Sequence, residues 1–500
     1  MYIFLRNNDY RYAAEQMLLM LFPEERPVYP RADLGLREEN AVELELKHGK
    51  TYTTAVCRLR YDRRTAQKHV RARTDGIRAG EERVRIEQRI LKLAFYRAAL
   101  DVGVPKPEWG CLTGVRPAKF LAGLMQKDGL TETAAVRMLT ETFGVSKERA
   151  SLALAAERAA ARAKAVLAPQ DVCLYIGIPF CPSRCSYCSF VSCNLDRDRK
   201  MVQPYVDCLC QEVEEIKAQA DKAGLTLCSI YIGGGTPTSL SADQLRQLMG
   251  TVRENFDLSK VVEYTVEAGR PDCTDAEKLA VIKEYGATRI SINPQTFSDA
   301  VLANIGRKHS AQDILDCYAD ARRAGHEDIN MDLIAGLPGD TVEGFEHSLR
   351  QAIALQPENI TVHTLTLKRA SRIVIEDQKE NDYADVAAML EKCHLLAEAG
   401  YRPYYLYRQK NTLQNLENVG WCKPGHEGYY NIYIMEEVQT ILSAGAGGST
   451  KLVADGGKRM QRIFNFKYPN EYIQRFAEVL ERKKGVAEFY DHNLGTETTG

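Results

Sequence analysis

The 500-residue sequence lacks several features that would assign it to a special class of protein. No positively charged start is followed by an apolar stretch, so we expect no signal peptide. No run of about 18 apolar residues occurs, so we expect no membrane-spanning helix and a cytoplasmic location. No internal repeat or low-complexity segment stands out. The formal net charge is only −1 and the hydrophobic fraction is 45%, which is typical of a globular protein.

Cysteine is too sparse for a disulfide-stabilised fold, because the 500 residues include only 14 cysteines. In a reducing compartment, scattered cysteines are mostly small core residues, whereas closely spaced ones more often bind metal or do redox chemistry. Three of the 14 are closely spaced, at Cys181, Cys185 and Cys188. This group is therefore the first candidate for a functional site.

The first 165 residues or so predict a mixed α+β domain. We expect a strand at Met1–Arg6, a helix at Tyr10–Leu21, a hairpin of Ala41–His48 with Thr51–Arg60, and helices from Arg83–Leu100 to about Ala165. Residues 51–100 carry 13 Lys or Arg against 5 Asp or Glu. Such a basic stretch is typical of a contact with nucleic acid or an acidic ligand. The interpretation we favour is a solvated helix face that acidic residues elsewhere balance.

From Val172 onward, short apolar strands alternate with helices, which is the pattern of βαβ units around a parallel sheet. The expected strands are Cys173–Ile178, Leu227–Gly233, Val261–Ala268, Thr288–Asn293, Ile329–Ile334 and Ile360–Leu367. The expected helices are Tyr205–Ala220, Ala242–Asn255, Asp275–Tyr285, Ala311–Ala324 and Thr341–Leu355. These units fit either an open barrel or a doubly wound sheet, and in both the functional site lies at the carboxyl ends of the strands.

The sequence after about Asn381 predicts a C-terminal extension near the mouth of the barrel. It contains a helix, the segment Arg402–Tyr407 and the glycine-rich segment Ser443–Ser449. We therefore expect three domains: an accessory domain at residues 1–165, a barrel at residues 166–380, and a substrate-covering region at residues 381–500.

The three cysteines directly follow the first of these strands, in Ile178-Pro-Phe-Cys181-Pro-Ser-Arg-Cys185-Ser-Tyr-Cys188. Three thiolates on a short loop can converge on one inorganic centre, and thiolates suit iron–sulfur clusters or zinc. A structural zinc site needs a fourth ligand, for which Cys193 is a candidate. A [4Fe–4S] cluster held by three cysteines leaves one iron with the open position that a catalytic metal site requires.

This Cys-x3-Cys-x2-Cys pattern is similar to the signature of the radical S-adenosylmethionine (SAM) superfamily. The resemblance implies that SAM binds the open iron through its amino and carboxylate groups, and that one electron from the cluster releases a 5′-deoxyadenosyl radical. Gly233-Gly-Gly235-Thr236-Pro237 resembles the motif for the methionyl amine, and Glu267 resembles the group for the ribose hydroxyls. Taken alone, these residues would be an ordinary turn and a surface ion pair.

Longer matches resemble one family of this superfamily, the oxygen-independent coproporphyrinogen III dehydrogenases. The matches lie within residues 172–465 at Tyr175–Cys181, Arg289–Gln295, Asn304–Arg307, Asn330–Pro338, Tyr407–Asn411, Asn415–Gly420, Tyr430-Asn431, Met435-Glu436 and Gly445–Gly447. The Asn-Pro-Gln at 293–295 and the long N-terminal domain with Thr113-Gly-Val-Arg-Pro117 are most similar to the branch called HemZ. The implied fold is α/β, a partial (β/α)6 barrel with an α+β N-terminal domain and a C-terminal extension.

The resemblance implies the oxidative decarboxylation of coproporphyrinogen III at two propionates, which gives protoporphyrinogen IX for haem biosynthesis. The radical takes a hydrogen from the propionate β-carbon, and the substrate radical then loses CO2 and one electron. A one-electron donor such as flavodoxin or ferredoxin is the implied partner, and no nucleic acid is expected.

The family binds two SAM molecules. Motif position assigns the first to Tyr175, Tyr187, Gly234 and Glu267, and the second to Gly235, Thr236, Gln295, Arg307 and Asp332. The planar fork of Arg307 suits a carboxylate. Without the resemblance, Gln295 and Asp332 would be turn caps and Arg307 part of a surface ion pair.

Two positions differ from the family's established enzyme. Phe190 stands where that enzyme has a further cysteine, and Gly177 stands where the family often has histidine. The missing cysteine is typical of the family's haem-chaperone branch, so a haem chaperone is the second hypothesis. Its axial ligands would be His363, His426 or a tyrosine of Tyr401–Tyr407.

A third hypothesis is an RNA-modifying radical enzyme that contacts phosphates through the basic stretch. The net charge of −1 and the coproporphyrinogen-type motifs argue against it. Under the first hypothesis, Arg402, Arg408 and Lys410 are candidates for binding an anionic macrocycle, because cations and aromatic rings alternate in this segment.

Overall fold

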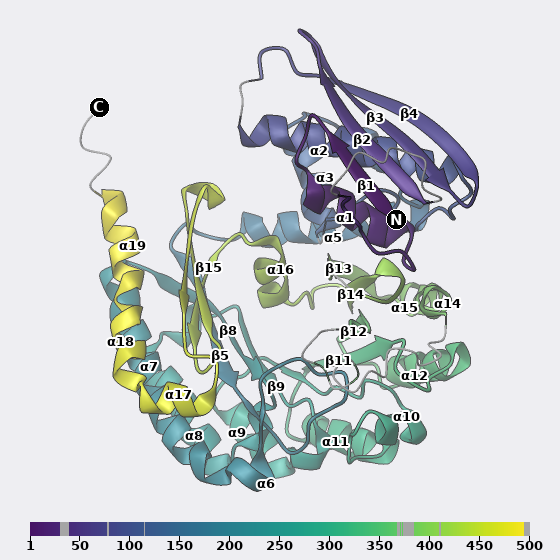
Figure 1. The fold of residues 1–500 in the computed structure, drawn as a ribbon. Coiled ribbons are helices and arrows are strands. Elements are labelled where there is room, and N and C mark those ends of the chain that lie inside the picture. Colours follow the sequence, from purple (N-terminus) through teal and green to yellow (C-terminus); the bar gives the residue numbers. More distant parts are fainter. Residues whose placement is uncertain are drawn as a thin grey trace. The chain divides into compact units, whose positions relative to one another are not determined.

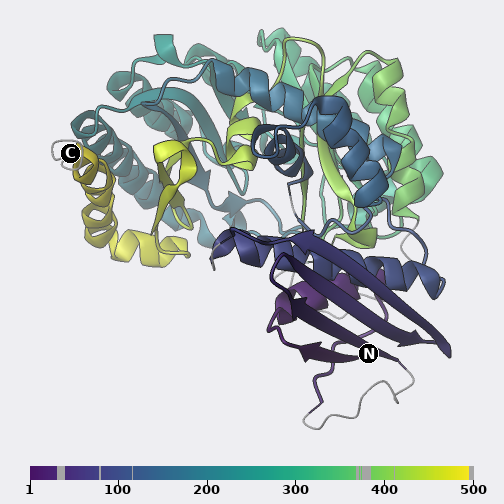
Figure 2. The same ribbon diagram turned by 90° about the horizontal axis from the view of Figure 1, so that it is seen from above.

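The computed structural model describes residues 1–30, 40–77, 80–114, 116–367, 371, 373, 385–409 and 412–494. The chain forms two compact units, Met1–Leu154 and Ala155–Gly500 (Figures 1 and 2). Each unit has its own sheet and its own core. The three domain boundaries expected from the sequence stay predictions.

The N-terminal unit is built on a four-stranded sheet in the order β1-β2-β3-β4. These strands are β1 (Tyr2–Arg6), β2 (Ala41–His48), β3 (Tyr52–Tyr61) and β4 (Arg64–Arg73). The hairpin of β2 and β3 confirms the prediction. Strand β4 was not predicted, and it turns back from β3 through Asp62 and Arg63, which both have positive φ, as a type I′ turn requires. The basic stretch is therefore not one helix face, since it runs through β3, β4 and the helix after them.

The helices of this unit are α1 (Arg11–Leu21), α2 (Glu81–Asp101), α3 (Pro117–Gln126), α4 (Glu132–Arg137) and α5 (Lys147–Ala165), the last of which continues into the second unit. Helix α2 packs against β3 and β4, and α1 packs against α2. Apolar residues at helical spacing form the core side of each, as with Met17 and Leu21 on α1 and Leu91 and Phe95 on α2.

The second unit is built on one open sheet of eleven strands. Its middle consists of six parallel strands: β5 (Asp171–Ile178), β8 (Thr226–Gly234), β9 (Glu263–Glu267), β10 (Arg289–Ser291), β11 (Asp328–Ala335) and β12 (Asn359–Thr364). All six expected strands and the α/β class are thereby confirmed, and the sheet curves without closing into a full barrel (Figure 1). A short pair, β6 (Phe180–Cys181) and β7 (Cys193–Asn194), stands apart from this sheet.

Helices cover the outer side of the curved sheet, one after another (Figures 1 and 2). They are α7 (Val202–Lys222), α8 (Ala242–Asn255), α9 (Ala276–Glu284), α11 (Ala311–Arg323) and α12 (Val342–Ala354). The short α6 (Leu195–Asp198) precedes α7 in the sequence, and the short α10 (Asp299–Asn304) comes between α9 and α11. Side chains toward the helices are apolar, such as Leu174 and Ile176 on β5, and are fully buried. The other side of the sheet carries polar and aromatic residues, so a ligand could bind there.

The C-terminal residues extend the sheet at both of its edges. Strands β13 (Arg402–Arg408) and β14 (Glu417–Cys422) add to β12, and β15 (Thr440–Ala444) adds in parallel to β5. Beyond β15 come β16 (Ser449–Ala454) and β17 (Arg459–Phe464). The helices described in this region are α14 (Val386–Glu391), α15 (His394–Glu398), α16 (Tyr429–Glu436), α17 (Pro469–Gln474), α18 (Phe476–Lys483) and α19 (Gly485–Leu494).

A fully buried ion pair ties the last helices to the first half of the sheet. Lys483 Nζ on α18 lies 2.9 Å from Glu212 Oε1 on α7, and neither side chain is exposed to solvent. The same carboxylate accepts hydrogen bonds from Tyr472 Oη at 2.5 Å, Asn465 Nδ2 at 2.7 Å and the Gly445 amide at 2.8 Å. A buried charge is tolerated when donors surround it in this way.

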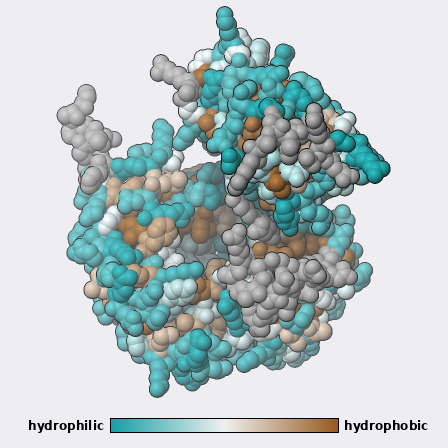
Figure 3. Space-filling view, in the orientation of Figure 1, coloured by the Kyte–Doolittle hydropathy of each residue, from teal (hydrophilic) through white to brown (hydrophobic). Residues whose placement is uncertain are grey.

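The visible surface of each unit is mainly hydrophilic, with small hydrophobic spots (Figure 3). Among the described residues, no helix is long and apolar enough to cross a bilayer.

Replacing Lys483 by methionine should destabilise the second unit by about 3–5 kcal/mol, because Glu212 would keep its charge without a cationic partner. Trp109 and Trp421 are the two tryptophans, so in a Trp109→Phe background urea unfolding followed by fluorescence reports on the second unit. Lys484→Met is the matched control, because Lys484 is exposed and pairs with Glu481 at the surface. Equal stability of the two variants would contradict the prediction.

Candidate active site

The three cysteines lie in a loop at the carboxyl end of β5, which we call the cysteine loop (residues 179–193). Cys185 is buried, and Cys181 and Cys188 are half-buried. The loop is fastened by the Ser186 amide, which donates to the Ile305 carbonyl at 3.0 Å, and by the Cys193 amide, which donates to the Pro179 carbonyl at 2.7 Å. The sulfurs are thus presented at the edge of the sheet where the other strands also end.

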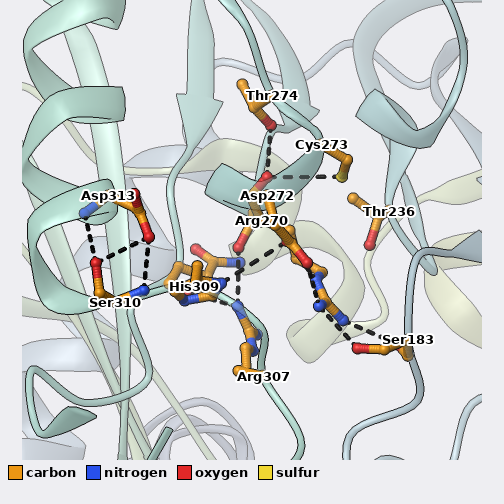
Figure 4. Close-up of polar contacts among 12 residues, drawn as sticks. Ser183, Thr236, Arg270, Asp272, Cys273, Thr274, Arg307, His309, Ser310 and Asp313 are labelled. Atoms are coloured by element: carbon orange, nitrogen blue, oxygen red, sulfur yellow. Dashed lines mark hydrogen bonds and ion pairs between the residues drawn. The ribbon is translucent and has the colours of Figure 1, made fainter. Parts of the chain in front are cut away.

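Arg270 braces this loop from the segment after β9 (Figure 4). Its guanidinium donates to the Ser183 carbonyl and the Ser183 hydroxyl, each at 2.9 Å, and one nitrogen lies 3.9 Å from Cys185 Sγ. Asp272 holds the same guanidinium at 2.6 Å, and His309 Nδ1 lies 3.7 Å from Asp272. Arg270 therefore fixes the loop to the end of β9 and places a positive charge beside Cys185.

Arg307 approaches the loop from the segment after α10. It donates to the carbonyls of Gly269 at 3.2 Å and Asn293 at 3.0 Å, and to the Tyr187 hydroxyl at 3.3 Å. Its Nε is buried and has no hydrogen-bond partner among the described residues. An orphaned donor inside a cationic pocket fits a bound anion, and carboxylates are the anions that a guanidinium binds best.

The glycine-rich segment after β8 passes directly under the cysteine loop. The Gly235 amide donates to the Ile178 carbonyl at 2.7 Å, and the Thr236 hydroxyl lies 3.5 Å from Cys181 Sγ. A Cβ atom on Gly235 would lie 2.7 Å from the Phe180 carbonyl and 3.0 Å from Cys181 Sγ, so no larger residue fits. This close approach explains why glycine is needed there.

Tyrosines and a carboxyl group line the inner wall next to this segment. Tyr231 Oη donates to Glu267 Oε1 at 2.5 Å, and the Tyr231 ring stacks on Tyr430 at 4.5 Å and on Tyr175 at 6.2 Å between centroids. Burial raises the pKa of Glu267 to about 7, against the hydrogen bond from Tyr231, which lowers it. Near neutral pH this carboxyl group can therefore either accept or donate a hydrogen bond.

Farther along the wall, Asp332 on β11 faces His363 on β12. The distance between Asp332 Oδ2 and His363 Nε2 is 3.7 Å, and His363 Nδ1 lies 3.4 Å from Tyr407 Oη. Gln295 is held beside them, because its amide donates to the Asp332 carbonyl and its carbonyl accepts from Ile334, each at 2.9 Å. Gln295 has a φ of 66°, which is unusual for a residue with a side chain and often marks a functional position.

Several other candidates lie away from this site. The His426 ring contacts Asp328 at the amino end of β11, and its carbonyl accepts from Arg289 and Asn359, so it belongs to the opposite end of the strands. Arg402 is exposed at the start of β13, beside Cys422, which pairs with Asn359 at the same end.

Arg408 is at the other end of β13 and is buried against the Asn415 carbonyl, which accepts from it at 2.9 Å. Burial lowers the pKa of Arg408 to about 10. Lys410 and Asn411 lie outside the described residues. Phe190 follows the third cysteine and is 61% exposed. Among the described residues, Arg270 and Arg307 contact the cysteine loop, and neither belongs to β13.

Among the described residues, no three His, Cys, Asp or Glu side chains are placed to hold a single metal ion. A cubane cluster binds each thiolate to a different iron, so its three sulfurs lie farther apart than the ligands of one ion. Burial raises the pKa of Cys181 and of Cys188, so a bound cationic centre would be needed to keep both as thiolates. The residues present therefore fit an iron–sulfur cluster.

Comparison with known proteins agrees with this geometry. Residues 175–352 match the family model of the radical SAM superfamily. The "oxygen-independent coproporphyrinogen-III oxidase-like protein HemZ" of Bacillus subtilis is 40% identical over 75% of this chain and 76% of its own length. The "heme chaperone HemW" of the same organism is 40% identical over 65% of this chain and 79% of its own length.

Among solved structures, the coproporphyrinogen III oxidase HemN of Escherichia coli, titled a radical SAM enzyme, shares the fold. Its TM-score is 0.50 at 24% identity, covering 66% of this chain and 73% of that one. Fold and cysteine loop together define a radical SAM protein. Within that superfamily, the chain belongs to the family of oxygen-independent coproporphyrinogen-III oxidase-like proteins. This membership implies a [4Fe–4S] cluster and SAM as cofactors.

Sequence reasoning missed the residues that support the site from behind. A chain of contacts runs behind Cys185, from Arg270 through Asp272 to His309. Tyr231 donates a hydrogen bond to Glu267. One signal was present, because Arg270 follows the end of β9 by three residues and so had to lie at the same edge of the sheet as the cysteines. The contact of Arg270 with Ser183 spans 87 residues and could not be read from spacing.

The ionisation of Glu267 should make the stability of the second unit depend on pH. The ordinary pKa of a glutamate is 4.5, and that of Glu267 in the folded protein is about 7. At a pH between these two values, the folded carboxyl group keeps a proton that the unfolded chain releases. Stability relative to Glu267→Gln should therefore fall by roughly 3 kcal/mol as pH rises through this window, and then level off. Urea midpoints of both proteins in the Trp109→Phe background, from pH 5 to 8, test this. Parallel pH profiles of the two proteins would refute it.

Proposed function

We propose that this chain catalyses the oxidative decarboxylation of coproporphyrinogen III to protoporphyrinogen IX. The observation that carries the proposal is the contact of Arg307 with Tyr187 in the cysteine loop. Arg307 contacts Tyr187 directly, and Gln295 shares a backbone hydrogen bond with Asp332. The contact of Arg307 supports the proposal, because it joins a residue expected to bind the second SAM to the loop expected to hold the cluster.

When bound, the cluster would supply the electron that cleaves SAM to a 5′-deoxyadenosyl radical. Cys181, Cys185 and Cys188 would hold it. One SAM would contact Tyr175, Tyr187, Gly234 and Glu267, and a second would contact Gly235, Thr236, Gln295, Arg307 and Asp332. Arg307 suits the carboxylate of the second because its Nε has no partner among the described residues.

The porphyrinogen would lie along the polar and aromatic wall beyond these residues. The rings of Tyr405 and Tyr407 lie there, 6.2 Å apart and nearly parallel, and would offer an aromatic surface to the pyrrole rings of the substrate. Each propionate loses one hydrogen atom, one electron and CO2 to become a vinyl group. An external acceptor takes that electron, and a donor such as flavodoxin or ferredoxin supplies the electron that starts each cycle.

An anaerobic assay with reconstituted protein, a one-electron reductant, SAM and coproporphyrinogen III tests the proposal. We expect 5′-deoxyadenosine together with protoporphyrinogen IX, in a ratio of two to one, since each vinyl group needs one radical. Cys185→Ser should lose both products and most of its iron. Cys193→Ser is the matched control and should keep its iron, because Cys193 lies outside the Cys-x3-Cys-x2-Cys pattern that is expected to hold the cluster.

Formation of deoxyadenosine without any porphyrin product would contradict the proposal that coproporphyrinogen III is the substrate, and it would support the radical cleavage of SAM. If the cluster is intact and neither product forms, the proposal that the chain is an enzyme is contradicted. Iron loss in Cys193→Ser to the level of Cys185→Ser would contradict the ligand set.

A haem chaperone is the second candidate function. Phe190 favours it, because this side chain has no group that could ligate or transfer a proton where the family's established enzyme has a cysteine. The 40% identity to a protein named heme chaperone points the same way. His363 is the histidine on the inner wall, and its hydrogen-bonding distance to Tyr407 places two possible iron ligands together.

If the chain is a chaperone, haem titration should give a one-to-one complex with a sharp Soret band. His363→Ala should weaken haem binding at least tenfold, since a neutral imidazole is a common axial ligand. His426→Ala is the control at the opposite end of the strands and should bind as the parent does. Equal effects of the two substitutions would exclude His363 as the ligand.

A further inference from the structure

The N-terminal unit contains a pocket of about 400 Å³ between α2 and the segment that leads into α3. Its lining includes six basic side chains, those of Arg85, Arg89, Lys92, Arg116, Lys119 and Lys127. Asp128 is the one acidic residue among the lining residues that the structure describes. A cavity with this charge balance attracts anions strongly.

Helix α2 directs its cations into the pocket by its periodicity. Arg85, Arg89 and Lys92 follow one another at i, i+4 and i+7, so they lie on one face of the helix, with Gln88 between them. Like charges at this spacing repel each other and weaken a helix. A bound anion would remove that repulsion.

Lys92 is a pocket cation whose hydrogen-bond acceptor is an uncharged hydroxyl group. Its side chain is half-buried, and its ammonium donates to the Thr113 hydroxyl at 2.9 Å. Burial lowers the pKa of Lys92, and a hydroxyl group cannot neutralise its charge. Thr113 opens the Thr113–Pro117 segment, which the sequence matches singled out and to which the proposed reaction gives no role.

The pocket also has an apolar, aromatic part. Phe120 and Phe143 pack edge to face at 5.1 Å, and the Arg89 guanidinium lies 5.8 and 6.0 Å from their centroids. The cations are spread, because Arg85 and Lys92 are seven residues apart, about 10 Å along the helix axis. A single phosphate cannot reach both ends. The geometry calls for a ligand with several anionic groups around an apolar body.

We propose that this pocket binds a small organic polyanion, with carboxylates or phosphates spaced around an apolar core. A tetrapyrrole with four propionates has this chemistry, and a nucleotide shares it. Of the two, the tetrapyrrole is favoured by the spread of the cations, and this choice rests on the proposed function. The N-terminal unit would then collect or hold the substrate.

The test uses the full chain and coproporphyrin III, the stable oxidised form, as a fluorescent probe. Hydrogen exchange should show protection of residues 81–127 on binding, and the affinity should fall as salt rises. Arg85→Gln/Arg89→Gln should weaken this binding at least tenfold and remove the protection. Lys50→Gln/Arg71→Gln removes two exposed cations that do not line the pocket and should change neither.

Protection by ATP but not by coproporphyrin III would keep the polyanion site and reject the tetrapyrrole. Protection by neither probe, or by transfer RNA alone, would overturn the proposal, as would equal losses in both double variants. The measurement needs no cluster, no SAM and no turnover. Repeating it in Cys185→Ser separates the two proposals, because pocket binding should persist there when decarboxylation is lost.

Discussion

The buried carboxylate of Glu212 is the constraint on which the rest of the second unit depends. A charge with no access to water must be matched completely, and this one is matched by Lys483, Tyr472, Asn465 and the Gly445 amide. These partners come from four separate parts of the C-terminal region. One carboxylate on α7 thus fixes α17, α18 and the glycine-rich turn around the first strand. Gly445 also packs against the Gly177 carbonyl, and a Cβ atom on Gly445 would lie only 2.5 Å from that oxygen. Gly177 is close to the start of the cysteine loop, so the packing of Gly445 reaches the loop.

The site divides its charges between two sides. Arg270 and Arg307 stand behind the cysteine loop, and Glu267 and Asp332 face it from the inner wall. A thiolate-bound cluster carries negative charge, and SAM carries a sulfonium, an ammonium and a carboxylate. The arginines therefore suit the cluster and the carboxylate, whereas Glu267 and Asp332 suit the amine and the ribose. The same arrangement would hold whether the second function or the first is correct, because both begin with the same cofactors.

The sequence was sufficient for the six parallel strands, because each is a short apolar run between helices of clear amphipathic period. It was also sufficient for the cysteine loop, since three cysteines at that spacing have few other uses. It did not predict β4, because Arg64–Arg73 carries mostly polar residues and pairs at a sheet edge where burial does not select apolar ones. Nor could it predict that Arg402 and Arg408 point to different ends of one strand, or that Arg270 reaches Ser183. Those facts depend on pairing between residues far apart in the sequence, which local sequence patterns do not predict.

The order of strands has a consequence for how the protein is made. Strand β5, which carries the cysteine loop, lies between β8 and β15, yet β15 is encoded more than 260 residues after β5. Synthesis proceeds at roughly 5–20 residues per second. The cysteine loop would therefore follow a strand that has no neighbour on one side until β15 is synthesised. Such late-closing contacts also make folding slow. Cluster assembly is therefore a step that follows synthesis, and the cysteines are most vulnerable to oxygen in the interval before the C-terminal strands arrive.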